Sequence, residues 1–129
     1  MKQKHFIADY MTRSPRTISA DVPLETAQSV LRENNIRHLP VIKDGKLAGI
    51  LSDRNVKIAL AYPGGERFVV EDAMIPDVFA VLANTDLAMV VEKMAEEKYG
   101  SAVILDAEGD VAGIFTMVDA CRALSRLLS

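Results

Sequence analysis

The feature that most constrains this chain is an internal repeat. Residues 47–55 read Leu-Ala-Gly-Ile-Leu-Ser-Asp-Arg-Asn, and residues 111–119 read Val-Ala-Gly-Ile-Phe-Thr-Met-Val-Asp. Earlier in each copy, Asp9 and Asp72 stand 63 positions apart, and after one inserted residue the offset becomes 64, as at Gly45 and Gly109. So many ordered coincidences indicate that one supersecondary unit is written twice.

The pattern of the first copy predicts strand, helix, strand, strand, helix. A short strand at 17–18 is followed by a helix that opens at Asp21 and Pro23 and closes at Asn34-Asn35, with one apolar face. Two apolar strands at 38–42 and 47–51 flank Asp44-Gly45, which is a strong hairpin signal. A second helix is expected from Asp53 to about Ala61. The residues expected on the inward face of the first helix are Leu24, Ala27, Val30 and Leu31.

The second copy repeats this order. We expect a strand at 78–81, a helix capped by Thr85 and ending near Gly100, and a hairpin of strands 102–105 and 111–115. The inward face of its helix is predicted to carry Leu87, Val90, Val91 and Met94. The first motif then covers residues 6–61, the second covers 70–127, and the Pro- and Gly-containing segment 62–69 connects them. Each copy has too few strands for a stable core, so the fold class is α/β with the two copies packed together.

Composition narrows the function classes. The 129 residues suit one compact domain, and 15 basic against 18 acidic residues give a net charge of -3, which argues against a binder of nucleic-acid backbones. Neither a membrane-spanning run of roughly 20 apolar residues nor a signal-peptide core is present, so a cytoplasmic protein is expected. The single cysteine, Cys121, fits a reducing compartment, and its apolar neighbours predict a buried thiol.

Each copy places a hydroxyl and an amide or carboxylate where a helix begins. Ser52 precedes Asn55, and Thr116 precedes Asp119, by three residues. Such a helix N-terminus can receive an anion or a ribose, but the same spacing also caps helices for backbone reasons alone. The glycines of the repeat, Gly49 and Gly113, can likewise serve either close packing or access for a nucleotide.

Little in the chain points to catalysis or to a metal. His5 and His38 are the only histidines, and no Ser-His-Asp or Cys-His signature accompanies them. With no cysteine close to either histidine, a transition-metal site is not expected. The sequence therefore predicts a protein that is not an enzyme.

The repeated order, with Asp-Tyr-Met-Thr at 9–12 and His-Leu-Pro-Val-Ile-Lys-Asp-Gly-Lys-Leu-Ala-Gly-Ile-Leu-Ser at 38–52, resembles a tandem pair of CBS (cystathionine β-synthase) domains, a Bateman module. The resemblance extends from about Phe6 to Leu127. It implies two pseudo-symmetric β-α-β-β-α units packed through their sheets, commonly assembled as a flat homodimer. It also implies a regulatory module that binds AMP, ADP, ATP, S-adenosylmethionine or NAD in the cleft between the repeats and signals to a regulated protein, with no required cofactor.

Carried onto this sequence, the family pattern assigns phosphate and ribose contacts to Ser52 and Asn55 in one copy and to Thr116 and Asp119 in the other. A carboxylate accepts from both ribose hydroxyls, so Asp119 is expected to suit ribose better than Asn55. Basic residues near the first motif are expected to draw phosphates there: Arg37, His38, Arg54 and Lys57. The walls for the base, which would offer backbone groups to it, are Thr17, Ile18, His38, Leu39, Pro40, Val78, Phe79, Ser101, Ala102 and Val103.

Two departures from the family pattern keep an alternative open. Asn55 stands where an acid is commoner, and Val103 stands where the first copy has Pro40. A structural dimerisation module with vestigial clefts is therefore the second hypothesis, and failure to bind any adenosyl compound would favour it.

Overall fold

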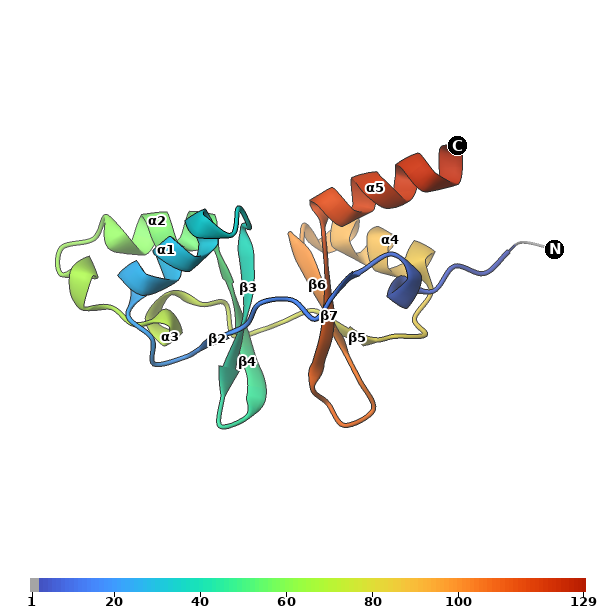
Figure 1. Cartoon of the computed structure of the whole chain (residues 1–129). Helices are drawn as coiled ribbons and strands as arrows, with labels where there is room; N and C mark the ends of the chain where they lie inside the picture. Colours follow the sequence, from blue (N-terminus) through green and yellow to red (C-terminus); the bar gives the residue numbers. More distant parts are fainter. Residues whose placement is uncertain (1–2) are drawn as a thin grey trace. The chain divides into compact units, whose positions relative to one another are not determined.

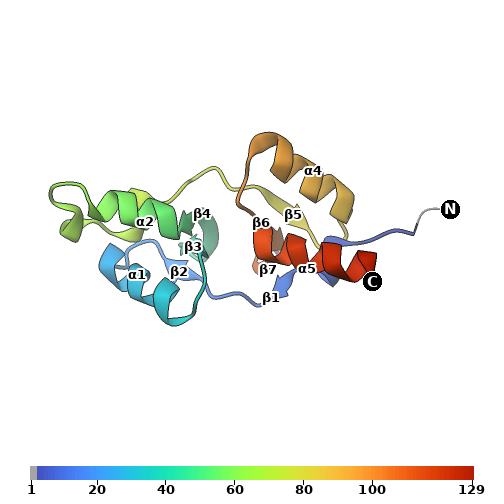
Figure 2. The same ribbon diagram turned by 90° about the horizontal axis from the view of Figure 1, so that it is seen from above.

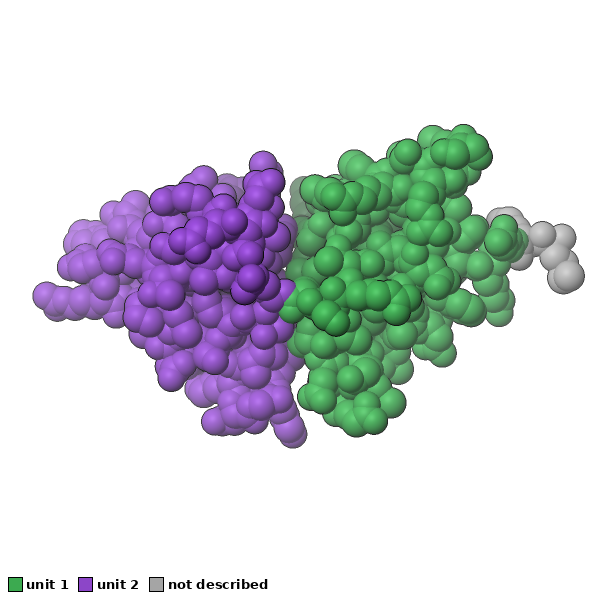
Figure 3. Space-filling view, viewed as in Figure 1, with its two compact units in different colours: residues 1–15, 79–129 green, residues 16–78 purple. Residues whose placement is uncertain are grey.

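The structure is a computed structural model, which describes residues 3–129. The chain folds as two compact units, one formed by residues 16–78 and the other by residues 1–15 together with 79–129 (Figures 1 and 3). The units do not follow the sequence repeats, because the segment that opens each repeat packs with the body of the other. The expected α/β fold class is confirmed.

The unit of residues 16–78 is built on a three-stranded sheet. Its order is β2-β3-β4, with β2 parallel to β3 and β3 antiparallel to β4. Asp44 and Gly45 both have positive φ, of 52° and 78°, so the predicted hairpin turn is confirmed. Figures 1 and 2 show α1 and α2 lying side by side on this unit. Its elements are β2 (Ile18–Ser19), α1 (Leu24–Glu33), β3 (His38–Lys43), β4 (Lys46–Ser52), α2 (Asp53–Leu60), η2 (Gly65–Arg67) and α3 (Val70–Ala73).

The other unit repeats this plan and adds an edge strand. The sheet order is β1-β7-β6-β5, in which β5 is parallel to β6 and the remaining pairs are antiparallel. Figure 2 shows β1, from the start of the chain, beside β7 and α5. Its elements are η1 (Ile7–Asp9), β1 (Thr12–Arg13), β5 (Ala80–Leu82), α4 (Leu87–Glu97), β6 (Ser101–Leu105), β7 (Val111–Thr116) and α5 (Met117–Leu128).

The exchanged opening segments make equivalent hydrogen bonds in both units. Leu24 N donates to Phe68 O at 2.9 Å, and Leu87 N donates to His5 O at 2.8 Å. These four residues are related by the 63-residue offset, so 68–75 in one unit occupies the place of 5–12 in the other. The repeat alignment therefore gives residue-by-residue structural equivalence.

The repeated glycines make room for these exchanged segments. A Cβ atom on Gly49 would lie 2.6 Å from Met74 Sδ and 2.8 Å from the Ile75 carbonyl oxygen. A Cβ atom on Gly113 would meet Met11 and lie 3.0 Å from the Thr12 carbonyl oxygen. Of the two readings of these glycines, the contacts favour close packing, here of a strand against the opening segment of the other repeat.

Each unit has its own apolar core between its sheet and its helices. In residues 16–78 the core is formed by fully buried side chains of α1, α2, β3, β4 and α3, such as Leu24, Leu39 and Val56. In the other unit Phe115, Ile104 and Val90 play this part. The predicted inward residues of both helices are at least partly buried, with one exception described next.

Three local predictions were wrong. Helix α4 is capped by Asp86, whose carboxylate accepts from Ala88 N at 3.3 Å, and not by Thr85. Val91 is 37% exposed, because the buried stripe of α4 runs through Leu87, Val90 and Met94. Cys121 is exposed, because α5 buries only the narrow face that carries Asp119 and Ala123.

Across residues 3–129, none of the helices combines the length and apolar character needed to cross a lipid bilayer.

Candidate functional site

The first predicted motif lies where β4 runs into α2. Ser52 is the N-cap of α2, and its hydroxyl oxygen accepts from Asn55 N at 3.1 Å. His38, at the start of β3, is paired in register with Ser52. Asp53 N donates to Arg37 O at 2.9 Å, which fixes the beginning of the helix beside β3. The capping role of Ser52 is thus confirmed, and its hydroxyl proton is not used by the cap.

His38 is held neutral at this helix terminus. Burial lowers the pKa of the half-buried imidazole, the positive charge of Arg37 lowers it further, and the carboxylate of Asp53 partly opposes both. A neutral imidazole offers one hydrogen-bond donor and one acceptor. The His38 ring can therefore bind a polar group without bringing a positive charge.

Asn55 is half-buried, and its side chain lines a hollow of about 310 Å³ on the side of α2 that faces α3. Within residues 3–129 the side-chain amide of Asn55 makes no hydrogen bond. Its backbone N–H is the group that donates to Ser52. The amide is thus free to donate to a ligand and to accept from it.

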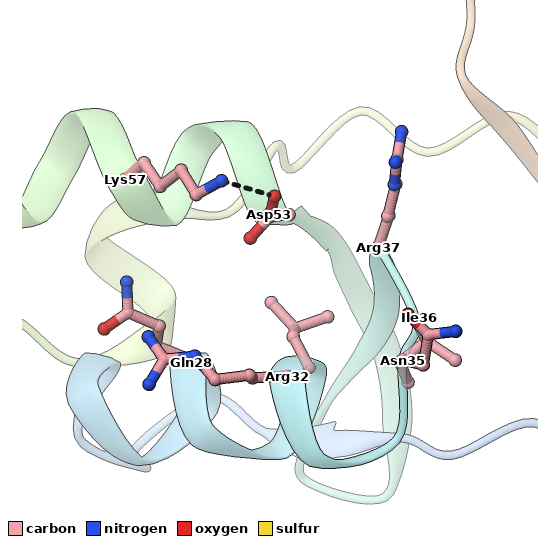
Figure 4. A pocket seen from close by; sticks show the side chains of 8 residues that line it. Gln28, Arg32, Asn35, Ile36, Arg37, Asp53 and Lys57 are labelled. Atoms are coloured by element: carbon pink, nitrogen blue, oxygen red, sulfur yellow. Dashed lines mark ion pairs between the residues drawn. The ribbon is translucent and has the colours of Figure 1, made fainter.

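The predicted basic residues do not gather around Asn55. Lys57 forms an ion pair with Asp53 at 3.1 Å and, with Arg37, lines a different hollow of about 220 Å³ between α1 and α2. In Figure 4 the Arg37 side chain points away from this ion pair. Arg54 is exposed on the first turn of α2. Of the predicted phosphate-attracting set, His38 is the one paired in register with Ser52.

The second predicted motif is arranged differently. Asp119 is only 4% exposed, and its Oδ2 accepts from Thr116 N at 2.9 Å and from the Thr116 hydroxyl at 3.1 Å. Its Oδ1 accepts from the Thr12 hydroxyl at 2.8 Å, and Arg122 Nη1 lies 3.7 Å away. Thr116 pairs in register with Ser101, as Ser52 does with His38. The carboxylate predicted to hold a ribose thus already joins β1 to the start of α5.

The residues predicted to form the walls for the base have mostly buried side chains, so they can offer a ligand backbone groups more readily than side chains. Ile18, Leu39, Ala102 and Val103 are all buried in the cores of their units. Pro40 and Ser101 are buried as well, Val78 and Phe79 are half-buried, and Thr17 is exposed. Phe79 is stacked on Tyr99 with ring centroids 5.1 Å apart.

Each sheet has a notch beside these walls. The short strand β2 pairs only with Val41 and Ile42, so no strand of residues 3–129 lies beside His38–Pro40 on that side. In the other unit β5 pairs with 103–105, which leaves Ser101 and Ala102 without a neighbouring strand from the described part of the chain on that side. The notches offer edge positions of the backbone near the two motifs.

Several residues near the motifs escaped sequence reasoning. Thr12 bonds to Asp119, and Tyr62, Phe68, Asp72 and Ala73 surround the hollow beside Asn55. The repeat offset, which the sequence shows, would find these residues once the exchange of opening segments is known. The exchange itself is seen only in the structure. Within residues 3–129, no group of three or more His, Cys, Asp and Glu side chains is placed to hold a metal ion.

Comparison with known proteins agrees with this architecture. The family model for the CBS domain matches residues 7–62 and 70–126. The inosine-5′-monophosphate dehydrogenase of Thermoplasma acidophilum is 30% identical over 107 residues, which are 83% of this chain and 21% of that enzyme. The L-aspartate semialdehyde sulfurtransferase of Methanocaldococcus jannaschii is 26% identical over 117 residues, or 90% of this chain and 22% of the relative. This chain thus spans about a fifth of the length of these curated relatives.

Solved structures cover nearly the whole chain. CBSX2 of Arabidopsis thaliana, in complex with AMP, aligns with a TM-score of 0.85 and 25% identity over 97% of this chain and 99% of that one. The CBS domain pair of protein MJ0100, in complex with 5′-methylthioadenosine and S-adenosyl-L-methionine, aligns with a TM-score of 0.86 and 25% identity over 95% and 98% of the two chains. The repeat, the fold and the two matched segments together establish that this chain belongs to the CBS domain family and carries a tandem CBS pair.

Proposed function

We propose that this chain is a regulatory module that binds an adenosine-containing ligand and carries out no catalysis of its own. Two CBS pairs of the same fold have been solved with AMP, or with 5′-methylthioadenosine and S-adenosyl-L-methionine. Each of these ligands contains adenosine, whose ribose and base suit amide, hydroxyl and backbone partners. The support for transfer to this chain lies in the residues of its first motif.

The observation that carries the proposal is the set of unused polar groups at the start of α2. The Ser52 hydroxyl proton, the neutral His38 ring and the Asn55 amide lie on adjacent elements there. A ribose hydroxyl can donate to the Asn55 carbonyl oxygen and accept from its amide nitrogen. The unpaired edge at His38–Pro40 supplies backbone groups for a base. We assign the adenosine ligand to this first motif.

The second motif is a weaker site in this proposal. A ribose that reached Asp119 would compete with the Thr12 hydroxyl and with two donors from Thr116. The carboxylate offers about four acceptor positions, of which three are taken, so it can accept from at most one of the two ribose hydroxyls as it stands. We therefore infer that ligand binding at Asp119 requires a movement of the N-terminal segment.

Which adenosyl compound is bound depends on charge near the first motif. Lys57 is paired with Asp53 at 3.1 Å, so Arg54 and Arg37 are the arginines of the predicted set left to meet a phosphate, and the charge of Arg37 reaches the His38 ring. This arrangement favours ligands with few phosphates, such as AMP or S-adenosylmethionine, over ATP. In this proposal Lys57 does not take part in the predicted attraction of phosphates, because it is ion-paired.

The experiment is a binding panel of AMP, ADP, ATP, S-adenosylmethionine and NAD, read by thermal shift and by isothermal titration calorimetry. A ligand that binds only the folded state stabilises it by about 2.7 kcal/mol at a hundredfold excess over its Kd. We expect Asn55→Ala to abolish the effect and Asp119→Ala, the change at the equivalent position of the other unit, to preserve it. Equal losses in both variants would contradict the assignment to the first motif.

A structural dimerisation module is the second candidate. It is favoured by the apolar side chains that α5 leaves in solvent, where Leu124, Leu127 and Leu128 are 58%, 45% and 77% exposed. These leucines are thus not part of the core of their own unit, and we propose that they meet a second copy in a homodimer. A stable dimer that responds to no member of the panel would favour this structural role, whereas a ligand-dependent change in sedimentation would favour regulation of a partner protein.

A further inference from the structure

The hollow beside Asn55 is lined mainly by apolar and aromatic side chains. We call it the α2 hollow. Its volume of about 310 Å³ lies at the lower end of the range of about 300–1,000 Å³ that is common for small-ligand pockets. It is lined by Asn55, Ile58, Ala59, Tyr62, Phe68, Asp72 and Ala73.

The equivalent place in the other unit is filled by an aromatic ring. Tyr10 occupies there the position that Ala73 holds beside the α2 hollow, by the 63-residue offset. Its ring lies edge-on to His5, with centroids 5.8 Å apart, and the Arg126 guanidinium stands 4.3 Å above it. The Tyr10 hydroxyl is 2.8 Å from His5 Nδ1, and Arg126 also donates to Asp9 O at 2.8 Å.

The residues that hold the Tyr10 ring have counterparts in the lining of the α2 hollow. His5 corresponds to Phe68 and Arg126 corresponds to Tyr62, so both ring-contacting positions are aromatic in the unit whose own ring is missing. Ala73 supplies only a methyl group where Tyr10 supplies a phenol. The α2 hollow is therefore the space that an aromatic ring fills in the other repeat.

The charges around the two places also differ. Arg122 and Arg126 of α5 are replaced by Ile58 and Tyr62 in α2, so both cations are lost. Asp72 remains, with one carboxylate oxygen accepting from Val69 N at 2.9 Å. Asn55 adds an amide. An anionic ring would meet a carboxylate and no cation, whereas a neutral or cationic ring with a hydrogen-bond donor at its edge would meet two acceptors.

We propose that the α2 hollow binds a neutral or cationic planar aromatic ring of a small molecule, packed against Tyr62 and Phe68, with a donor at its edge directed to Asn55 or Asp72. Aromatic rings favour offset or edge-to-face contacts of this kind. The ring has two sources, a separate aromatic amine or the purine base of an adenosine ligand, and in the second case the base lies in this hollow and not at the His38–Pro40 edge. The inference does not depend on the proposed function, because it rests on the comparison of the two repeats.

The test uses the full chain and two probes, adenosine and tryptamine, measured by isothermal titration calorimetry and by saturation-transfer NMR of the ring protons. Ala73→Tyr builds into the hollow the ring that the other unit already holds, and Ala73→Ser is its matched control. We expect Ala73→Tyr to raise the Kd of the ring-bearing probe at least tenfold and Ala73→Ser to leave it within twofold. Tyr62→Ala tests the contact of the ring with Tyr62, and because Tyr62 is 64% exposed the change does not destabilise the apolar core.

The outcomes separate the sources and the two proposals. Loss of adenosine binding in both Ala73→Tyr and Tyr62→Ala identifies the ring as the purine base, and loss of tryptamine binding alone identifies a separate ligand. Adenosine binding that resists both variants but fails in Asn55→Ala, without tryptamine binding, overturns this inference and leaves the proposed function standing. If neither adenosine nor tryptamine binds, the proposed aromatic site in the α2 hollow is overturned as well.

Discussion

The hydrogen bond from Thr12 to Asp119 is expected to hold the N-terminal segment on the second sheet. Asp119 is 4% exposed, and among residues 3–15 of the opening segment only the Thr12 side chain donates a hydrogen bond to it, at 2.8 Å. A hydrogen bond to a charged group contributes about 1.5–3 kcal/mol. Thr12 itself is exposed, so water can partly replace its hydroxyl, which places the effect in the lower part of that range.

We therefore expect Thr12→Val to lower the free energy of unfolding by about 1.5–2 kcal/mol. Valine keeps the β-branched shape that suits β1, so the change removes the hydroxyl with little else. Urea denaturation followed by far-UV circular dichroism measures the difference. Thr12→Ser, which keeps the hydroxyl, should recover most of the loss, and Arg13→Ala on the same strand should stay within about 0.5 kcal/mol of the parent.

A double-mutant cycle measures the interaction energy between Thr12 and Asp119 directly. Asp119→Asn weakens the acceptor for Thr12 and for Thr116 together, so the cycle with Thr12→Val isolates the Thr12 contribution. A coupling energy near zero, or a Thr12→Val protein as stable as the parent, would show that the Thr12 hydroxyl adds nothing to the other contacts of the N-terminal segment, such as its pairing with β7 and the bond from Arg126 to Asp9 O.

Two further changes probe other parts of the fold. The folded state lowers the pKa of His38 below its ordinary value of 6.5. The contribution of His38 to the free energy of unfolding is therefore complete above about pH 6.5 and is lost as the pH falls toward the folded-state pKa. His38→Gln should flatten the pH profile of stability between about pH 7 and 5, and His5→Gln serves as its control. Gly49→Ala should cost about 1–3 kcal/mol in urea denaturation, because its Cβ would lie 2.8 Å from the rigid carbonyl of Ile75. Gly109→Asn, which enters open space at a positive φ that asparagine tolerates, should cost less than Gly49→Ala, and equal costs would contradict the packing explanation.

The sequence was sufficient to predict the body of each repeat. Apolar runs bounded by Asp44-Gly45 in the first copy and by an Asp- and Gly-containing turn in the second located both hairpins, because turn chemistry and strand alternation are local signals. Cap identity was harder, since Thr85 and Asp86 are both good caps and only backbone geometry selects Asp86. Burial on α5 was misjudged at Cys121, because apolar neighbours on a helix need not share its buried face.

The exchange of opening segments could not be predicted from the sequence. Asp9 and Asp72, and Met11 and Met74, are identical in the two copies, so nothing local tells which sheet each segment joins. The choice is made by long-range pairing, such as Thr12 opposite Ile114 and Ile50 opposite Ile75. As a result, sequence reasoning identified both helix-start motifs but missed the residues that the exchange brings beside them.

The differences between the two repeats are coupled across the exchange. Where the opening segment supplies the Thr12 hydroxyl, the facing helix supplies the Asp119 carboxylate that accepts from it. At the aligned positions of the other unit stand Ile75 and Asn55, and Ile75 has no hydroxyl to donate to the Asn55 amide. One unit thus satisfies the polar groups at its helix start internally, while the other leaves them to solvent or to a ligand. A ligand stabilises only the state that it binds preferentially. Occupancy of the first motif therefore changes the stability of the unit of residues 16–78. The other unit, whose polar groups are bonded internally, keeps the N-terminal segment in place.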